Sequence, residues 1–178
     1  MLNGITLGII ITIVILFLCT ILSILVSALL TPMAKTPTKT LDEIADLLNP
    51  SKDDVFVDFG SGDGRLIFKI YERSHCKCLG YDVSPLMIIL SNVTKIFKFP
   101  LQKDIFFDAQ NVFKVDISNA TKIYCFLDTR SMKILKPKLE KFVKNGGEVY
   151  SYVYNIEGMR NEKKMELSNG KELYIYKG

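Results

Sequence analysis

The pattern of apolar and polar positions divides this chain into two parts. From Met1 to Ala34 no side chain is charged, and residues 5–30 are almost entirely Ile, Leu, Val, Phe and small residues. Because about 20 helical apolar residues cover a hydrocarbon core of about 30 Å, this pattern predicts one membrane-spanning helix. A cleaved signal peptide would need a basic start and an apolar core of only about 7–15 residues, and the segment has neither. We expect residues 1–34 to form a retained anchor with the start of a linker, followed by one domain at 35–178.

The charges that flank the apolar segment predict its orientation. Lys35 and Lys39 follow the segment, and nothing basic precedes it. Since basic residues favour the cytoplasmic side of a membrane, we expect a single-pass membrane protein with its domain in the cytoplasm.

Beyond the anchor, strand-like and helix-like patterns alternate. Strands are predicted at 55–59, 78–82, 104–107, 122–128 and 148–154, and helices at 40–48, 65–73, 85–97 and 132–144. Thr40 and Glu43 have the capping-box spacing at the start of the first of these helices. Two last strands, at 163–167 and 172–176, flank Asn169-Gly170 and predict a closing hairpin. This alternation predicts an α/β fold with a mostly parallel sheet of seven strands.

A glycine-rich loop follows the first of these strands. Val55–Phe59 runs into Gly60, Gly62 and Gly64, with an acid two residues before the first glycine. Glycine permits positive φ and lets a ligand approach main-chain N–H groups. Dinucleotide folds use a different spacing, G-x-G-x-x-G, which argues against an oxidoreductase. The spacing here resembles motif I of class I S-adenosylmethionine-dependent methyltransferases. The expected cofactor residues of this loop are Asp58, Gly60, Ser61, Gly62, Asp63 and Gly64.

Two further positions fit a nucleoside cofactor. Asp82 ends the second predicted strand, 18 residues beyond Gly64, close to the distance at which such folds place an acid on ribose hydroxyls. Alternatively, Asp82 and Ser84 only cap the following helix. After the third strand, Asn111 can donate and accept hydrogen bonds toward an adenine edge, with Val112 beside it.

Composition narrows the possible partners. The formal net charge is +4, and acids are interleaved with the basic residues, so we expect no nucleic-acid partner. Cys76, Cys78 and the single His75 are too few for a four-ligand zinc site, and we expect no bound metal.

The motifs taken together resemble a narrower group. An N-terminal span, the run from Val57 to Arg65, Gly80-Tyr81-Asp82 and the run from Asn111 to Asp116 are similar to the membrane-anchored lysine methyltransferases that modify the adenine nucleotide translocase and the ATP synthase c subunit, and to their prokaryotic relatives. The resemblance implies a Rossmann-like three-layer sandwich, S-adenosylmethionine as cofactor and a lysine of a membrane protein as acceptor. That family usually has Glu in place of Asp82 and Asp in place of Asn111.

The acceptor side is less defined by sequence. Asp128, at the end of the fourth predicted strand, is a candidate for holding or deprotonating the acceptor, and it is equally a candidate N-cap for the helix that follows. Methylation of a membrane-resident lipid or quinone, and a non-catalytic S-adenosylmethionine-binding scaffold, remain alternative functions.

Overall fold

The computed structural model describes residues 3–30, 36–160 and 163–178. The chain divides into two compact units, residues 1–35 and 36–178. In the first unit, α1 (Gly4–Leu30) is a single apolar helix. Its window Gly4–Ser23 has a mean hydropathy of 3.0 and no buried side chain, so it is long and apolar enough to cross a bilayer.

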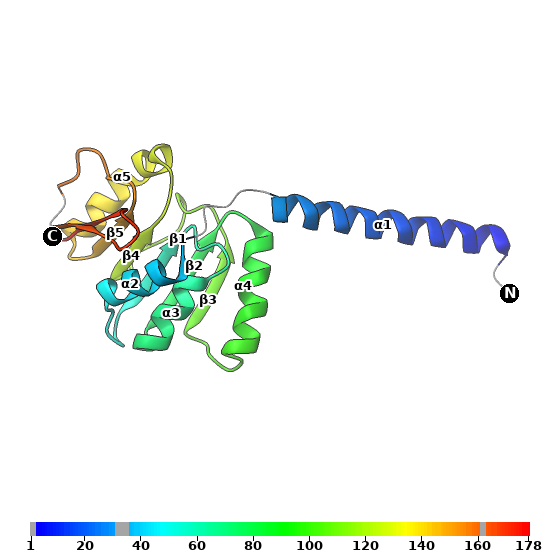
Figure 1. The fold of residues 1–178 in the computed structure, drawn as a ribbon, viewed down its shortest axis with the longest axis horizontal. Coiled ribbons are helices and arrows are strands. Elements are labelled where there is room, and N and C mark those ends of the chain that lie inside the picture. Colours follow the sequence, from blue (N-terminus) through cyan, green and yellow to red (C-terminus); the bar gives the residue numbers. More distant parts are fainter. Residues whose placement is uncertain (1–2, 31–35, 161–162) are drawn as a thin grey trace. The chain divides into compact units, whose positions relative to one another are not determined.

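The second unit is a three-layer α/β sandwich (Figure 1). Its helices are α2 (Thr38–Leu48), α3 (Arg65–Ser74), α4 (Pro85–Lys98) and α5 (Thr129–Lys144). Its strands are β1 (Val55–Phe59), β2 (Lys77–Asp82), β3 (Ile105–Ala109), β4 (Lys122–Cys125), β5 (Glu148–Tyr152), β6 (Lys163–Glu166) and β7 (Glu172–Tyr176). They form one sheet in the order β3-β2-β1-β4-β5-β7-β6. The first five strands are parallel and β7 is antiparallel to both neighbours, which confirms the predicted sheet.

Each face of the sheet has its own apolar core. Phe56 and Tyr124 face the core that α2, α3 and α4 cover. Val57 and Ile123 face the other core, which α5 covers together with the segment between β3 and β4. That segment, residues 110–121, contains no helix, so α5 is the one helix that packs on this face among the described residues.

The start of α2 differs from the sequence prediction. The helix begins at Thr38 with Pro37 as N-cap residue, and no side chain caps it. Thr40, predicted as the cap, lies inside the helix with its side chain buried. Glu43 instead accepts hydrogen bonds from the N–H of Ser168, at 3.0 and 3.2 Å. The capping-box prediction was therefore wrong, because proline already has the extended conformation that precedes a helix.

Two strands are shorter than predicted, each for a local reason. The fourth strand ends at Cys125, and Asp128 caps α5, which therefore begins at Thr129 instead of Met132. The fifth ends at Tyr152 because Val153 has φ +71°, a left-handed conformation that breaks strand geometry. Both strands end at the edge of the sheet where the glycine loop lies.

Candidate cofactor site

The centre of the sheet places the glycine loop. β1 pairs with β2 on one side and with β4 on the other. The connection that leaves β1 and the separate connection that enters β4 therefore run away from each other. In open parallel sheets this divergence opens a crevice at the carboxyl ends of the strands, where ligands bind. Asp58 lies in β1 just before this edge, opposite Gly80 of β2 and Tyr124 of β4.

Two buried polar atoms in this crevice lack partners among the described residues. They are Oδ1 of Asp58, whose residue is 2% exposed, and Oγ of Ser61, whose residue is 7% exposed. An unpaired buried polar atom costs free energy, and such atoms are rare in native proteins. Asp58 lies just before the loop and Ser61 lies within it, so the two atoms indicate a place for a polar ligand at the loop.

The glycines adopt conformations that other residues rarely take. Gly60, Gly62 and Gly64 have φ of +80°, +54° and +79°. The N–H groups of Gly60 and Ser61 both donate to the carbonyl oxygen of Tyr81, at 2.8 and 3.1 Å. A Cβ on Gly62 would meet nothing within 4 Å, so open space lies beside it. The loop is thus fixed to the end of β2 and leaves room for a ligand.

Phe107 of β3 explains why two glycines are needed. A Cβ on Gly64 or on Gly80 would lie 2.6 Å from the Phe107 ring, which is itself buried. The ring therefore fills the space that the two missing side chains leave. Sequence reasoning did not find Phe107, because nothing in its own neighbourhood shows which strand its ring will face.

Asp82 joins the glycine loop to the start of α4. Its Oδ2 accepts from the N–H of Gly62 at 2.9 Å, and its Oδ1 accepts from the N–H of Ser84 at 2.8 Å. Ser84 is the N-cap residue of α4. Each carboxylate oxygen can accept a second hydrogen bond, so the geometry is compatible with the ribose role as well as with the local role.

Asp63 and Arg65 connect the loop to the start of α2. Arg65 Nε donates to Asp63 Oδ1 at 3.1 Å, and Arg65 Nη1 donates to the carbonyl oxygen of Thr36 at 3.1 Å. Thr36 and Thr40 are both buried. Arg65 was not predicted as a site residue, and it holds the segment that precedes α2 against the loop.

The predicted adenine segment lies next to Asp82. The N–H of Gln110 donates to the carbonyl oxygen of Asp82 at 3.0 Å. Asn111 is exposed, and its Oδ1 accepts from the N–H of Phe113 at 3.0 Å. The Val112 side chain is buried in the core on the face of the sheet that α5 covers.

Lys138 of α5 holds this segment in place. Its Nζ donates to the carbonyl oxygens of Val112 at 3.2 Å, of Phe113 at 3.4 Å, and of Val115. It also lies 5.7 Å from the centroid of the Phe59 ring. Burial lowers the pKa of the Lys138 ammonium. On the sequence Lys138 is one of five lysines along the helix, and no local signal separates it from its solvated neighbours.

Replacing Lys138 with methionine should destabilise the domain. Charged hydrogen bonds to neutral partners contribute about 1.5–3 kcal/mol, so we expect a loss of about 1–3 kcal/mol in the free energy of unfolding. Lys141→Met, on the exposed side of the same helix, is the matched control and should change it by less than about 0.5 kcal/mol. Denaturant unfolding of the full chain measures both. Equal effects of the two variants would contradict the role given to Lys138.

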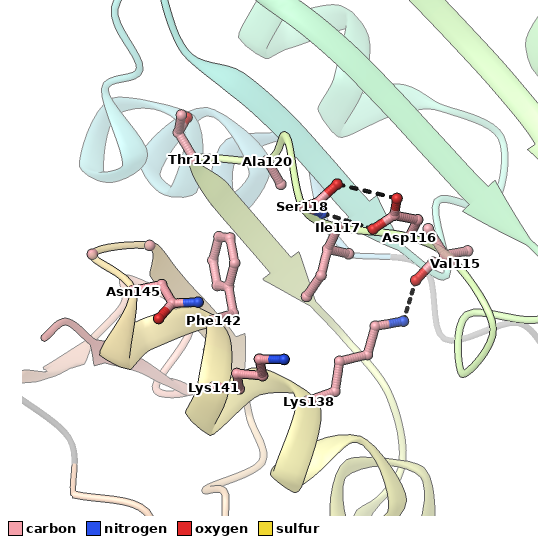
Figure 2. Close-up of a pocket in the computed structure, with 12 residues that line it drawn as sticks. Val115, Asp116, Ile117, Ser118, Ala120, Thr121, Lys138, Lys141, Phe142 and Asn145 are labelled. Carbon is pink, nitrogen blue, oxygen red and sulfur yellow. Dashed lines mark hydrogen bonds between the residues drawn. The ribbon is translucent and has the colours of Figure 1, made fainter.

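A hollow of about 530 Å³ lies beside α5, and Val115, Lys138 and Lys141 are among the residues that line it (Figure 2). Its lining includes Ile117 and Thr121, which lead into β4, and Gly146, which precedes β5. These are the amino ends of the strands, whereas the glycine loop lies at the carboxyl ends. None of the site residues predicted from sequence lines this hollow.

Asp128 follows β4 at the carboxyl edge of the sheet, where the glycine loop lies. An ideal Cβ on Gly60 would lie 3.0 Å from Cδ2 of Leu127, so the segment that carries Asp128 lies against the glycine loop. Asp128 is exposed and accepts hydrogen bonds from the N–H and Oγ of Ser131, at 3.0 and 2.8 Å. These bonds lower the pKa of its carboxyl group. The predicted N-cap is thus present, and the carboxylate is ionised at neutral pH.

Three aromatic rings gather beside this segment. The Phe126 ring lies 4.9 Å from that of Tyr152 and 6.4 Å from that of Tyr154, between centroids. Val153, whose φ is positive, separates the two tyrosines. Strained backbone of this kind is found preferentially at functional sites.

The electrostatics of the crevice favour a cationic ligand. Burial raises the pKa of Asp58 to about 8, and the nearby carboxylates of Asp82 and Asp63 add to the rise. A ligand that carries positive charge would relieve this repulsion. In the described ranges no group of three His, Cys, Asp or Glu residues could hold a metal ion.

Several solved structures with this fold are methyltransferases. An RNA methyltransferase from Salinibacter ruber in complex with S-adenosyl-L-homocysteine has a TM-score of 0.73 and 22% identity, covering 80% of this chain and 92% of that one. The magnesium protoporphyrin IX methyltransferase from Synechocystis with bound SAM has a TM-score of 0.65 and 12% identity, covering 79% of each. The fold is therefore that of class I methyltransferases, as the sequence predicted.

Sequence comparison identifies the family within this class. Residues 58–163 match the model of the ANTKMT methyltransferase domain, and the chain belongs to this family. A protein-lysine N-methyltransferase from Saccharolobus islandicus is 31% identical over 154 residues, covering 82% of this chain and 92% of that protein. Family membership confirms the methyltransferase class and the S-adenosylmethionine cofactor expected from the sequence.

Proposed function

We propose that this chain is a membrane-anchored protein-lysine N-methyltransferase whose acceptor is a membrane protein. The observation that carries the cofactor-binding part of the proposal is the pair of unpartnered buried atoms, Asp58 Oδ1 and Ser61 Oγ, at a glycine loop with open space beside it. Residues 1–34 would be the anchor and the linker start, and residues 35–178 the catalytic domain.

The residues of the crevice fit S-adenosylmethionine. Asp58, Ser61 and the N–H groups of the loop would bind its amino-acid end, Asp82 its ribose, and Asn111 with the Val112 backbone its adenine. The complete proposed set is Asp58, Gly60, Ser61, Gly62, Asp63, Gly64, Asp82, Asn111 and Val112. When bound, the cofactor supplies an electrophilic methyl group on a sulfonium. The protein then has mainly to place the acceptor in line with that group.

The acceptor would approach over the carboxyl ends of β4 and β5. Phe126 and Tyr154 offer aromatic faces, which attract ammonium groups and pack against a lysine stem. Asp128 is ionised, so its charge would hold the incoming ammonium rather than act as a strong base. Loss of the ammonium proton is helped by desolvation, which lowers the pKa of a buried lysine. The S. islandicus relative, named a protein-lysine N-methyltransferase, supports lysine as the acceptor.

Membrane anchoring rests on α1 and its flanking charge. The helix has the length and apolarity of a span, and Lys35 and Lys39 follow it. The positive-inside tendency then puts the domain in the cytoplasm, where S-adenosylmethionine is available.

The test is transfer of a labelled methyl group in membranes. The full chain is incubated with S-adenosylmethionine labelled in its methyl group and with membranes of the source cells. Gly62→Val, which fills the open space of the loop, is the inactive control. We expect label in methyllysine after acid hydrolysis of the protein fraction, and at least tenfold less with the control. Label that partitions into the lipid extract would instead establish a lipid or quinone acceptor, and no transfer by a chain that binds cofactor would favour the scaffold.

A further inference from the structure

An apolar surface covers the outward side of α4. Among the described residues of the second unit, ten large apolar side chains are exposed, and seven of them lie from Val83 to Leu101. Those on the helix itself are Ile89, Leu90, Val93, Ile96 and Phe97, with exposed fractions from 44% to 83%. Their spacing of three, four and seven residues puts them in one stripe. We call these five residues the α4 apolar surface.

The inward side of α4 is apolar too. Met87 and Ile88 are buried there, and the helix packs on β2 and β3. The protein covers only this side of the helix, so the exposed stripe on the other side stays uncovered. Large exposed apolar patches mark contact sites for another protein or for a membrane.

The charged residues within the α4 segment are all basic, which favours an anionic partner. Residues 83–103 contain Lys95, Lys98 and Lys103 and no acidic residue. Lys98 and Lys103 are exposed. Long lysine side chains can lay their stems on an apolar surface and place their ammonium groups among lipid phosphates.

The composition of the surface distinguishes a bilayer from a protein partner. Protein interfaces gain most of their binding energy from Trp, Tyr and Arg, and residues 83–103 contain none of them. Aliphatic residues and phenylalanine beside lysines are the composition of helices that lie in a membrane interface.

The length of the chain makes such a contact possible. α1 ends at Leu30 and α2 begins at Thr38. The intervening seven residues reach at most about 25 Å even when fully extended. A domain that follows a membrane span by so few residues stays within reach of the bilayer surface.

We infer that the α4 apolar surface docks on the face of an anionic lipid bilayer. The inference rests on the proposed anchoring, to which it adds a second membrane contact. Two contacts would restrict how the domain turns above the bilayer, and the anchor makes the second one effectively intramolecular.

Tryptophan fluorescence tests this contact site by site, because the chain contains no tryptophan. The Phe97→Trp variant carries its single tryptophan within the α4 apolar surface, at a position where the Phe97 side chain is 83% exposed. The full-length variant is reconstituted in vesicles of anionic phospholipid with brominated acyl chains, which quench tryptophan on contact. We expect its emission to fall by about half or more, since interfacial helices bury their apolar face about 5–10 Å deep.

Ile134→Trp is the matched control, because Ile134 is an exposed aliphatic residue of α5. Its emission should not change between brominated and ordinary lipid. Lys98→Gln combined with Lys103→Gln should reduce quenching of the Phe97→Trp chain, as should vesicles without anionic lipid.

Three results would overturn the inference. In the first, the Phe97→Trp chain sediments with the vesicles and binds S-adenosylmethionine, but its emission is not quenched. This result would overturn the α4 contact and leave the proposed function standing. Another is a blue-shifted emission that depends on protein concentration and not on brominated lipid, which would assign the surface to a second copy. The third is a chain that fails to sediment with vesicles at all, which would remove the anchor as well.

Discussion

Replacing Asp82 with alanine should weaken S-adenosylmethionine binding by about 100-fold or more. A carboxylate that accepts from both ribose hydroxyls makes two charged hydrogen bonds, each contributing about 1.5–3 kcal/mol. The substitution also frees the N–H of Gly62, which Asp82 holds at 2.9 Å. Calorimetric titration of the full chain with S-adenosylmethionine measures the change.

Two further variants make this result specific. Asp82→Glu, the residue that the family resemblance places here, should keep binding within about tenfold, because a carboxylate remains within reach of the ribose. Asp104→Ala removes an exposed acid at the amino end of β3 and should leave binding unchanged. If Asp82→Ala bound the cofactor as tightly as the unmodified chain, Asp82 would have only its local role beside α4.

Cofactor affinity should rise steeply with pH up to about pH 8. Burial raises the pKa of the Asp58 carboxyl group to about 8, so the protein without cofactor carries a proton on this group at neutral pH. A cationic cofactor favours the ionised carboxylate, and binding then releases that proton. Because one proton is linked to binding, the affinity should increase by up to about tenfold per pH unit below pH 8 and level off above it. Calorimetry between pH 6 and 9, in buffers of different ionisation enthalpy, measures both slope and proton release.

The Asp58→Asn chain provides the control for this dependence. It has no proton to release at this position, so its affinity should be nearly independent of pH. Without cofactor, the folded protein retains a proton on Asp58 that the unfolded chain loses near its ordinary pKa of 3.8. Stability of the cofactor-free protein should therefore fall as pH rises from about 4 to about 8, and less so in Asp58→Asn. If the stability of the unmodified cofactor-free chain did not change between about pH 4 and about pH 8, Asp58 would be ionised throughout this range.

The sequence predicted those parts of the molecule that depend on local pattern. Strand–helix alternation and the spacing of Gly60, Gly62 and Gly64 were enough for the fold, the sheet and the loop. Asp82 could be placed because the end of a parallel strand lies at a known edge of the sheet. The structure brings these residues together through hydrogen bonds that main-chain N–H groups of the loop donate to the Tyr81 carbonyl oxygen and to the Asp82 carboxylate.

Features that depend on distant neighbours could not be predicted. Lys138 and Phe107 contact partners that lie at least 23 residues away in the chain. Neither residue has a distinctive sequence around it. The positive φ of Val153 ended β5 two residues early, although valine usually favours strands. The outward side of α4 resembles a buried face in sequence, because an apolar pattern alone does not show whether anything covers it.

Because α5 is the helix that covers one face of the sheet, that face can be completed only late in synthesis of the chain. Residues 55–109 contain β1 to β3 with their two crossover helices, and could associate while the ribosome is still synthesising the rest. Residues 110–112, which we propose to contact the adenine, then await Lys138, which emerges 26 residues after Val112. A nascent chain would thus present a half-built crevice, and would first bind its cofactor tightly once α5 has docked.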